Sequence, residues 1–340
     1  MKQDKMILLT TPMRSGSSLL SRMLSANSEV AMSFDTVNFF RFCYGRYDPI
    51  NSTENAKRLI QDMSFRLKNR FEINLDVNKC LNKLGSAELT YGAIYWAILK
   101  TLFPGDDIHY LGDKESMAWT RIPAFLEMFP EGKAIIIVRD PRDVVNSFKH
   151  TTIAKGSDYL ISLFDVIDAI NHGVRLSSRM PDRVMMVKFE SLKFHPEIEA
   201  KRLCNFLGLN FDPIMLDEKS YTDHFGGTWN AKESLSFPAE NDKFAPVGRW
   251  KKMMSSDDLF LCEWIAKKQI QDIGQALSGV TFTQKDFDSA IQKITSSPLL
   301  REAFKNWCET GEGVEKFPLD PINPANWDPN WVKKPEAFSK

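Results

Sequence analysis

Several classes of protein are excluded by features that the sequence lacks. It carries no net charge, because 44 Lys and Arg residues balance 44 Asp and Glu residues. Such a chain offers no global electrostatic attraction to nucleic acid or to an anionic membrane, so we expect neither as a partner and expect any anion site to be local. No run of about 18 apolar residues occurs, so we expect no transmembrane helix.

Paired cysteines and targeting signals are missing as well. The five cysteines are scattered, with no CxxC pair and no histidine at the spacing of metal ligands. We therefore expect reduced, mostly packed thiols and no bound metal. The amino-terminal residues lead straight into an apolar segment, without the pattern of a signal peptide. A cytoplasmic location is the expectation that follows.

The sequence does contain an apolar segment, a Gly/Ser loop and a helix-like segment near its amino terminus. Residues 6–9 have the pattern of a buried strand, and the apolar spacing after Pro12 predicts a helix whose first turn is 16–19. The unpaired N–H groups of that turn, the serine hydroxyls and the Arg14 guanidinium would converge on one phosphate- or sulfate-sized anion. The residues of this predicted cradle are Arg14, Ser15, Gly16, Ser17, Ser18 and Leu19.

Two other interpretations of the loop stay open. Ser-Gly-Ser is also a common turn composition, so the segment could be a capped helix with Arg14 solvated. An ATP-binding P-loop needs Gly-Lys-Ser or Gly-Lys-Thr at the helix start, and no lysine occurs between Lys5 and Lys57. A mononucleotide kinase is therefore disfavoured, whereas binding of a phosphorylated nucleotide is not.

Later apolar segments extend the alternation of strands and helices. Residues 108–111 predict a second core strand that ends at Gly-Asp-Lys-Glu, residues 134–138 predict a third, and a further one lies within 183–192. In an open parallel sheet, ligands bind beyond the carboxyl ends of the strands, which places Lys114 beside Arg14 unless Lys114 is simply solvated. We therefore predict an α/β fold, with a P-loop-like central parallel sheet flanked by helices.

Arg139 and Asp140 directly follow the third predicted strand, and Pro141 marks the first turn of a helix. An apolar strand before an aspartate is typical of a Walker-B motif. However, Arg139 places a cation where Mg²⁺ would need oxygen ligands. Arg139 is better suited to a phosphate, to which it can donate two hydrogen bonds.

A helical block interrupts the alternation. Residues 52–71, 75–84 and 88–103 carry apolar residues at helical spacing. We interpret the block 52–103 as an insertion that builds the wall of an acceptor pocket, with a purely structural layer as the equal alternative. Before it, Asp35 is a carboxylate in an apolar and aromatic setting, and it is either a functional group or a helix N-cap.

Two of these motifs, in this order, resemble the signature elements of the sulfotransferases that use 3′-phosphoadenosine 5′-phosphosulfate (PAPS). They are the segments 12–19 and 139–147. The resemblance implies that the first segment binds the 5′-phosphosulfate, with Arg14 as its cation. It also implies that Arg139 and Ser147 bind the 3′-phosphate.

Two further residues resemble the branch of that family that includes the tyrosylprotein sulfotransferases and bacterial-type enzymes. Lys114, in Gly-Asp-Lys, resembles the strand-end lysine of this branch. Asp35 follows Arg14 by the interval that separates the loop cation from the catalytic glutamate in these enzymes. Aspartate, one methylene shorter, is a departure from the pattern.

The remaining resemblance concerns the nucleotide. Phe189 stands where the family usually has tyrosine, and it would pack on the adenine. The segment 226–252 resembles the coenzyme-covering segment: Arg249 and Lys251 would neutralise phosphates, and Trp250 would cover the nucleotide or anchor the loop. Helices are predicted over 196–207 and 257–273.

We expect a single sulfotransferase domain over residues 1–310. Residues 311–340 are rich in proline and also contain tryptophan, so this arm is neither a helix nor a central strand, and we expect it to be docked on the body.

The predicted function is transfer of a sulfuryl group from PAPS to a hydroxyl of a soluble small-molecule or carbohydrate acceptor. The product would be adenosine 3′,5′-bisphosphate. Arg14 and Lys114 would stabilise the leaving group and Asp35 would take the acceptor proton, with His109 or Glu115 as alternative bases. A kinase-like phosphotransferase and a non-catalytic bisphosphate-binding protein are the alternatives.

Overall fold

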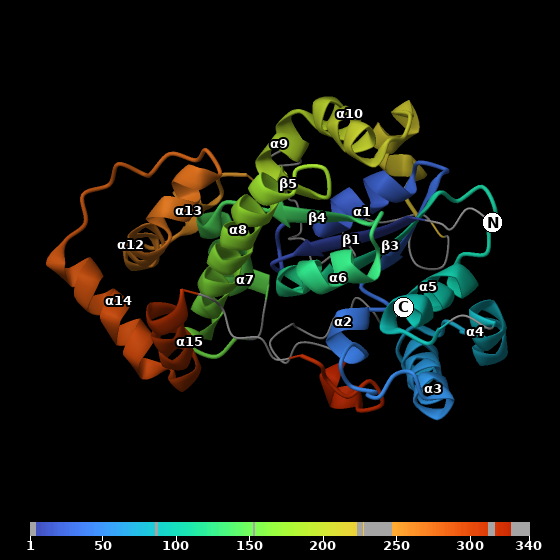
Figure 1. The fold of residues 1–340 in the computed structure, drawn as a ribbon. Coiled ribbons are helices and arrows are strands. Elements are labelled where there is room, and N and C mark those ends of the chain that lie inside the picture. Colours follow the sequence, from blue (N-terminus) through green and yellow to red (C-terminus); the bar gives the residue numbers. More distant parts are fainter. Residues whose placement is uncertain are drawn as a thin grey trace.

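The computed structural model describes residues 5–85, 88–151, 154–222, 227, 247–311 and 317–327. Five strands form one sheet in the order β2-β3-β1-β4-β5, and every neighbouring pair is parallel. Helices cover both faces of the sheet (Figure 1). The predicted α/β fold with a central parallel sheet is therefore confirmed. The strands are β1 (Lys5–Thr11), β2 (Val30–Phe34), β3 (Tyr110–Ser116), β4 (Lys133–Val138) and β5 (Val184–Lys188).

Two strands differ from the sequence prediction. The pattern does not predict β2, because its alternation of larger apolar residues with Ala31 and Ser33 extends over only five residues. The predicted end of β3 at residue 111 is wrong, since the strand continues to Ser116. The reason is that the polar residues of β3 are paired in the sheet, with β2 as far as Lys114 and with β1 as far as Ser116.

The buried residues of β1 divide between the two faces of the sheet. Ile7 and Leu9 pack with the layer that contains α1 and α10, whereas Met6 and Leu8 pack with the layer that contains α5, α6 and α8. A strand buried on both faces is a continuous apolar run, which is the pattern that predicted this one. These layers are built from α1 (Ser17–Ser25), α5 (Tyr91–Leu102), α6 (Ile122–Met128), α7 (Pro141–Thr151), α8 (Ile161–Arg179), α9 (Phe189–Phe194) and α10 (Pro196–Leu207).

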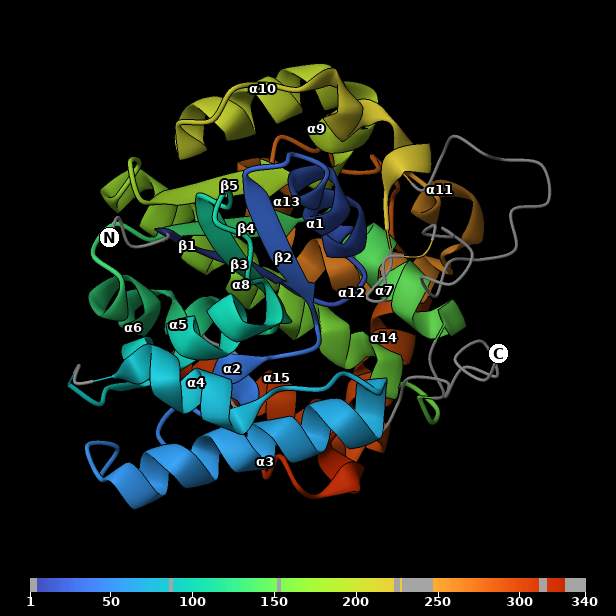
Figure 2. The same ribbon diagram turned by 90° about the vertical axis from the view of Figure 1, so that its right-hand side faces the viewer.

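The predicted helical block is observed. After the one-turn helix α2 (Phe39–Phe42) it contains α3 (Thr53–Phe71), α4 (Val77–Leu84) and the helix α5. The side chains of Ser52, Asp76 and Thr90 each accept a hydrogen bond from the backbone N–H three residues later, and these caps set the start of each helix. In Figure 2, α3 lies along the edge of the molecule, with α4 beside it.

The carboxyl-terminal helices form a group beside α7 and α8 (Figure 1). The helix predicted over 257–273 is observed as two helices that meet at Ala266. This group contains α11 (Trp250–Met253), α12 (Ser256–Ile265), α13 (Lys267–Asp272), α14 (Gln284–Ser296) and α15 (Pro298–Thr310). The short 3-10 helices are η1 (Trp119–Arg121), η2 (Asp158–Leu160), η3 (Pro213–Leu216), η4 (Glu218–Ser220) and η5 (Pro324–Asn326).

Residues 317–327 of the predicted arm lie against the helical block. The backbone N–H of Leu319 donates to the carbonyl of Arg41 at 2.7 Å, and the ring of Trp327 lies 6.5 Å from that of Phe65. Trp331 and the other residues beyond 327 lie outside the described residues.

The cysteines and the helices agree with two features of the sequence. All five cysteines are free thiols, and all but Cys308 are buried, as predicted. No helix within the described part of the chain is both long enough and apolar enough to cross a membrane.

Asp258 joins the carboxyl-terminal helices to α7. Its buried carboxylate accepts hydrogen bonds from Lys149 of α7 at 2.7 Å, from Lys293 of α14 at 2.6 Å and from the Tyr159 hydroxyl at 2.8 Å. Burial by itself would raise the pKa of Asp258, but the hydrogen bonds from the two lysines outweigh it and hold the pKa below its usual value. A depressed pKa in the folded state means that this stabilisation is present above the ordinary pKa of aspartate and is lost as the pH falls.

We predict that Asp258→Asn lowers the free energy of unfolding by about 3 kcal/mol, because it removes the buried carboxylate that Lys149 and Lys293 share, and only Lys293 keeps a second carboxylate, that of Asp257. The loss should shrink as the pH falls below about 4, because the carboxylate is then protonated in the unfolded chain while its depressed pKa keeps it charged in the folded chain, so the stabilisation that it supplies decreases. Urea denaturation at several pH values measures both effects. The surface pair of Lys268 and Asp272 provides the control, since Asp272→Asn should cost about 0.5 kcal/mol or less. Equal losses for the two variants would contradict the prediction.

Candidate functional site

The Gly/Ser loop joins β1 to α1 at the carboxyl edge of the sheet. Gly16 precedes the helix with φ of 90°, and its carbonyl accepts from the N–H groups of Leu19 and Leu20. Ser17 and Ser18 begin α1. This confirms the predicted order of strand, loop and helix.

Gly16 is required by its neighbour as well as by its backbone conformation. A Cβ atom at this position would lie 2.1 Å from the ring of Phe189, which is far inside van der Waals contact. The Phe189 ring is therefore packed against the loop, and its exposed fraction is 6%. Packing of this ring on an adenine stays a prediction.

The loop hydroxyls differ in their surroundings. Ser15 Oγ is buried and has no hydrogen-bond partner among the described residues. A buried hydroxyl without a partner costs free energy, so this atom is suited to a ligand that supplies an acceptor.

Arg14 links the two predicted nucleotide motifs. Its Nε donates to Ser147 Oγ on α7 at 3.1 Å. Burial, together with the nearby charges of Arg139 and Arg249, lowers the pKa of Arg14 to about 10. Three guanidinium groups from the loop, from the end of β4 and from the start of α11 therefore share one region, and they repel one another.

Arg139 supports the loop directly. Its Nη1 donates to the carbonyl of Arg14 at 2.9 Å, and its guanidinium carbon lies 4.9 Å from the centre of the Phe189 ring. Burial lowers the pKa of Arg139, and the carboxylates of Asp143 and Glu190 act in the opposite direction. Asp143 Oδ2 is 3.9 Å from Arg139 Nη2, so this ion pair is a loose one.

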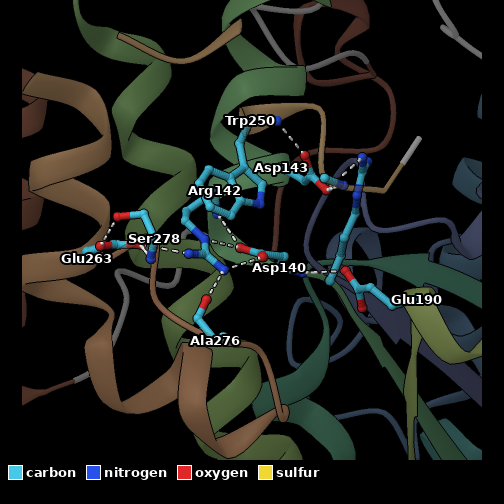
Figure 3. Close-up of polar contacts among 10 residues, drawn as sticks. Asp140, Arg142, Asp143, Glu190, Trp250, Glu263, Ala276 and Ser278 are labelled. Atoms are coloured by element: carbon cyan, nitrogen blue, oxygen red, sulfur yellow. Dashed lines mark hydrogen bonds and ion pairs between the residues drawn. The ribbon is translucent and has the colours of Figure 1, made fainter. Parts of the chain in front are cut away.

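Asp143 and Trp250 hold the end of the predicted coenzyme-covering segment against α7. The two oxygens of Asp143 accept from the N–H groups of Gly248 and Trp250, at 2.6 and 3.0 Å. The Trp250 ring is buried over the guanidinium of Arg142, at 3.8 Å, as Figure 3 shows. Of the two roles that were predicted for Trp250, this geometry is that of an anchor. Lys251 Nζ lies 5.6 Å from the same ring, and residues 228–246 of the segment are outside the described residues.

Arg142 is the centre of a buried ion network (Figure 3). It donates to both oxygens of Asp140, at 3.0 and 2.7 Å, and to Glu263 of α12 at 2.7 Å. The carboxylate of Asp140 is therefore held by Arg142, which is the physical reason why the Walker-B interpretation is wrong. The network also fixes α12 against the start of α7.

The second half of the site lies at the end of β3. Lys114 Nζ forms an ion pair with Asp35 Oδ2; the exposed fraction is 6% for the lysine side chain and 43% for the aspartate side chain. The backbone N–H of Asp35 also donates to the carbonyl of Lys114 at 2.9 Å. The structure thus brings these two predicted catalytic residues into direct contact.

Asp35 is not a helix cap. It has φ of 58°, a left-handed conformation that aspartate adopts more readily than most residues, and the residue that precedes α2 is Asn38. Asn38 Nδ2 donates to the carbonyl of Asp35 at 2.8 Å, and the buried Arg66 of α3 donates to the carbonyl of Thr36. The turn that carries Asp35 is therefore held from both sides, and the helical block contributes to it.

The alternative bases lie elsewhere. His109 precedes β3 at its amino end and pairs with Glu29, so it is five strand residues, or about 17 Å, from Lys114. Glu115 is buried on the opposite face of β3, where it accepts from the N–H groups of Phe40 and Arg41. Burial raises its pKa well above the usual value. Neither residue shares the surroundings of Asp35.

Strand register sets the distance between the two halves. Lys114 pairs with Leu9 and Ser116 with Thr11 in the neighbouring strand β1, and the loop with Arg14 begins beyond that edge. The cations therefore come from adjacent strands at the carboxyl edge of one sheet. A cavity of about 280 Å³ lies apart from these residues, at the start of the helical block, and is lined by Arg46, Tyr47, Asp48, Asn55 and Arg58. The predicted acceptor wall stays a prediction.

A parallel sheet with a Gly/Ser loop between β1 and α1 at its carboxyl edge defines the chain as a P-loop-like protein of the α/β class. The sequence profile of the sulfotransferase family matches residues 7–213, and the chain belongs to that family.

Individual relatives are distant. Protein-tyrosine sulfotransferase 1 of Danio rerio is 25% identical over 136 residues, which cover 39% of this chain and 38% of that protein. Protein-tyrosine sulfotransferase of Drosophila melanogaster is 24% identical over 221 residues, which cover 63% of this chain and 40% of that protein. The chain thus spans about two fifths of the length of these relatives. A solved sulfotransferase domain from the curacin biosynthetic pathway is 17% identical with a TM-score of 0.51, covering 82% of this chain and 100% of that domain, and it supports the fold.

Sequence reasoning missed three residues of this region. Arg142 and Asp143 lie in the same motif as Arg139. Arg142 anchors α12 and Asp143 anchors α11, and both helices lie more than 100 residues further along the sequence. Ser116 bonds to Asp35 and follows Lys114 by two residues. Strand periodicity could have identified Ser116, because residues two apart in a strand lie on the same face. This requires the strand to extend to residue 116, as β3 does.

We predict that Gly16→Ala weakens binding of adenosine 3′,5′-bisphosphate about ten- to hundredfold, because the methyl group meets the Phe189 ring and the loop must move. Isothermal titration calorimetry measures the loss. Gly279 also has a positive φ, of 72°, but nothing lies within 4 Å of its added Cβ, so Gly279→Ala controls for backbone strain and should leave the affinity unchanged. Equal affinities of Gly16→Ala and the unchanged chain would contradict the assignment of the loop.

Proposed function

We propose that the chain is a sulfotransferase that moves the sulfuryl group of PAPS to an acceptor hydroxyl. The observation that carries the proposal is the convergence of Arg14, Arg139 and Arg249 at the loop. Like charges that are gathered in one region repel one another, and an anion bound among them offsets this repulsion. A nucleotide with a 5′-phosphosulfate and a 3′-phosphate supplies negative charge at two points.

Each motif has a part in binding such a nucleotide. The N–H groups at the start of α1 and the Ser15 hydroxyl suit the 5′-phosphosulfate, together with Arg14. Arg139 and Ser147 suit the 3′-phosphate, and the hydrogen bond from Arg14 to Ser147 supports the proposal by joining the two motifs. Arg249 and Lys251 are brought to the same edge by the Asp143 anchor.

The acceptor step follows from the pair at the end of β3. Sulfuryl transfer forms a bond from the acceptor oxygen to sulfur and breaks the bond from sulfur to the bridging oxygen, whose electron pair stays with the phosphate. Asp35 takes the acceptor proton, and it is the more exposed member of the pair. Lys114 and Arg14 stabilise the charge that develops on the leaving phosphate.

The other functions have less support. A kinase-like phosphotransferase would use Asp140 at a metal site, and Arg142 holds that carboxylate. A non-catalytic bisphosphate-binding protein has no use for an exposed carboxylate paired with a nearly buried lysine at the edge of the anion site.

The acceptor is the open part of the proposal. The sequence favoured a small-molecule or carbohydrate hydroxyl in the cytoplasm, and both named relatives are protein-tyrosine sulfotransferases. We therefore include a tyrosine side chain among the candidate hydroxyls. Transfer from ³⁵S-labelled PAPS to a tyrosine peptide, to its phenylalanine counterpart, to a simple phenol and to a sugar alcohol separates these classes.

We predict that adenosine 3′,5′-bisphosphate raises the Tm more than AMP does, because only the bisphosphate offers a 3′-phosphate to Arg139 and Ser147. A tenfold preference corresponds to about 1.4 kcal/mol of extra stabilisation when both ligands saturate. Thermal unfolding with each ligand measures the difference.

Ser147→Ala should reduce this preference and leave the AMP shift unchanged. Ser177→Ala, which removes a hydroxyl that bonds only within α8, is the matched control and should leave both shifts as they are. Equal shifts with the bisphosphate and with AMP in the unchanged chain would refute the nucleotide assignment.

We predict that Lys114→Ala lowers turnover about 10²-fold or more and that Asp35→Asn lowers it about 10²- to 10⁴-fold, with bisphosphate affinity changed much less. Steady-state kinetics and calorimetry on the same preparations test this. Lys133→Ala removes a lysine at the amino end of β4, away from the site, and should keep full turnover. Parallel losses of turnover and of affinity would make Lys114 a binding residue.

A further inference from the structure

We propose that Ser116 is a positioning residue that orients the Asp35 carboxylate so that Oδ2 takes the acceptor proton. This inference rests on the proposed function and deepens it. Ser116 Oγ lies 3.2 Å from Asp35 Oδ1, and the Ser116 backbone nitrogen lies 3.3 Å from the same oxygen. Lys114 holds the other oxygen, Oδ2. Each oxygen of the carboxylate thus has its own donor residue.

A count of hydrogen-bond sites points to the reacting atom. A carboxylate offers about four acceptor sites, two on each oxygen. The hydroxyl and the N–H of Ser116 take both sites on Oδ1, and Lys114 takes one on Oδ2. The site that remains is on Oδ2, so the proton of the acceptor hydroxyl goes there.

The arrangement needs a positioning residue because the Asp35 side chain is partly exposed, although the turn that carries it is buried on both sides. Its side chain is 43% exposed, and a short carboxylate with one partner can still rotate about its Cα–Cβ and Cβ–Cγ bonds. Two donors from Ser116 remove that freedom. A site that holds its reacting group to within about 0.5 Å keeps the geometry that proton transfer requires.

Ser116 is well placed for this task because it belongs to the sheet. It pairs with Thr11 of β1, and it lies on the same face of β3 as Lys114. Ser116 Oγ is also 3.4 Å from Lys114 Nζ, so all three side chains meet. The opposite face of β3 is held by Glu115, which bonds to α2. Movement of Ser116 would therefore require movement of the centre of the sheet.

A double-mutant cycle tests the assignment. Ser116→Ala should lower kcat about ten- to hundredfold, the effect of one lost hydrogen bond to a charged group, and should leave the KM for PAPS and the Tm nearly unchanged. Ser116→Thr keeps the hydroxyl and should retain most of kcat. In the Asp35→Asn background, Ser116→Ala should cause less than about a twofold further loss, because residues that act through one another are not additive.

Ser64→Ala is the matched control, since it removes a serine hydroxyl that bonds to the carbonyl of Leu75, outside the site, and it should leave kcat unchanged in both backgrounds. The same fold loss for Ser116→Ala in both backgrounds, or no loss in either, would overturn the role of Ser116 while the unchanged chain still turns over. If the unchanged chain transfers no label to any acceptor, the proposed function itself fails, and the role of Ser116 fails with it.

Discussion

Burial of the charged end of β3 is the constraint on which the site depends. The strand lies between β2 and β1, and it carries Asp113, Lys114 and Glu115 into the interior. Charged groups inside a protein are costly unless they are paired, so each of these side chains has a partner. The Tyr95 hydroxyl donates to Asp113, the start of α2 donates to Glu115, and Asp35 pairs with Lys114. These contacts fix the conformation of the chain between β2 and α2. They place Asp35, the candidate base, at the carboxyl edge of the sheet.

The half of the site that is proposed to bind the nucleotide gathers like charges instead. The positive charges of Arg139 and Arg249 help to lower the pKa of Arg14. Under the proposed function, the anionic nucleotide offsets this repulsion. The rigidity needed to hold them comes from elsewhere, because Phe189 packs against Gly16 and Arg142 anchors Trp250. The arginines that are proposed to bind the anion are thus distinct from the neighbouring residues that hold the loop and α11 in place.

The helices outside the sheet form two groups that support different halves of the site. Arg66 of the helical block donates to the turn after Asp35, and residues 317–327 bond to Arg41 of α2. The carboxyl-terminal helices hold α7, which carries Ser147, through Asp258 and Glu263. Each half of the site is therefore supported by its own group of helices.

The sequence by itself determined the elements and most of the candidate residues. Apolar periodicity predicts β1, β4, the helical block and the parallel sheet, because such patterns are local and each residue reports its own burial. It also places Arg14, Lys114 and Arg139 at strand ends. Only the tertiary structure decided which side chains meet. The pairing of Asp35 with Lys114, the contact of Ser116 with Asp35 and the anchoring of Trp250 by Arg142 and Asp143 join segments that are 79 to 108 residues apart. These contacts depend on strand order and register, which a local pattern does not encode, since a shift by one residue turns every side chain of a strand to the other face.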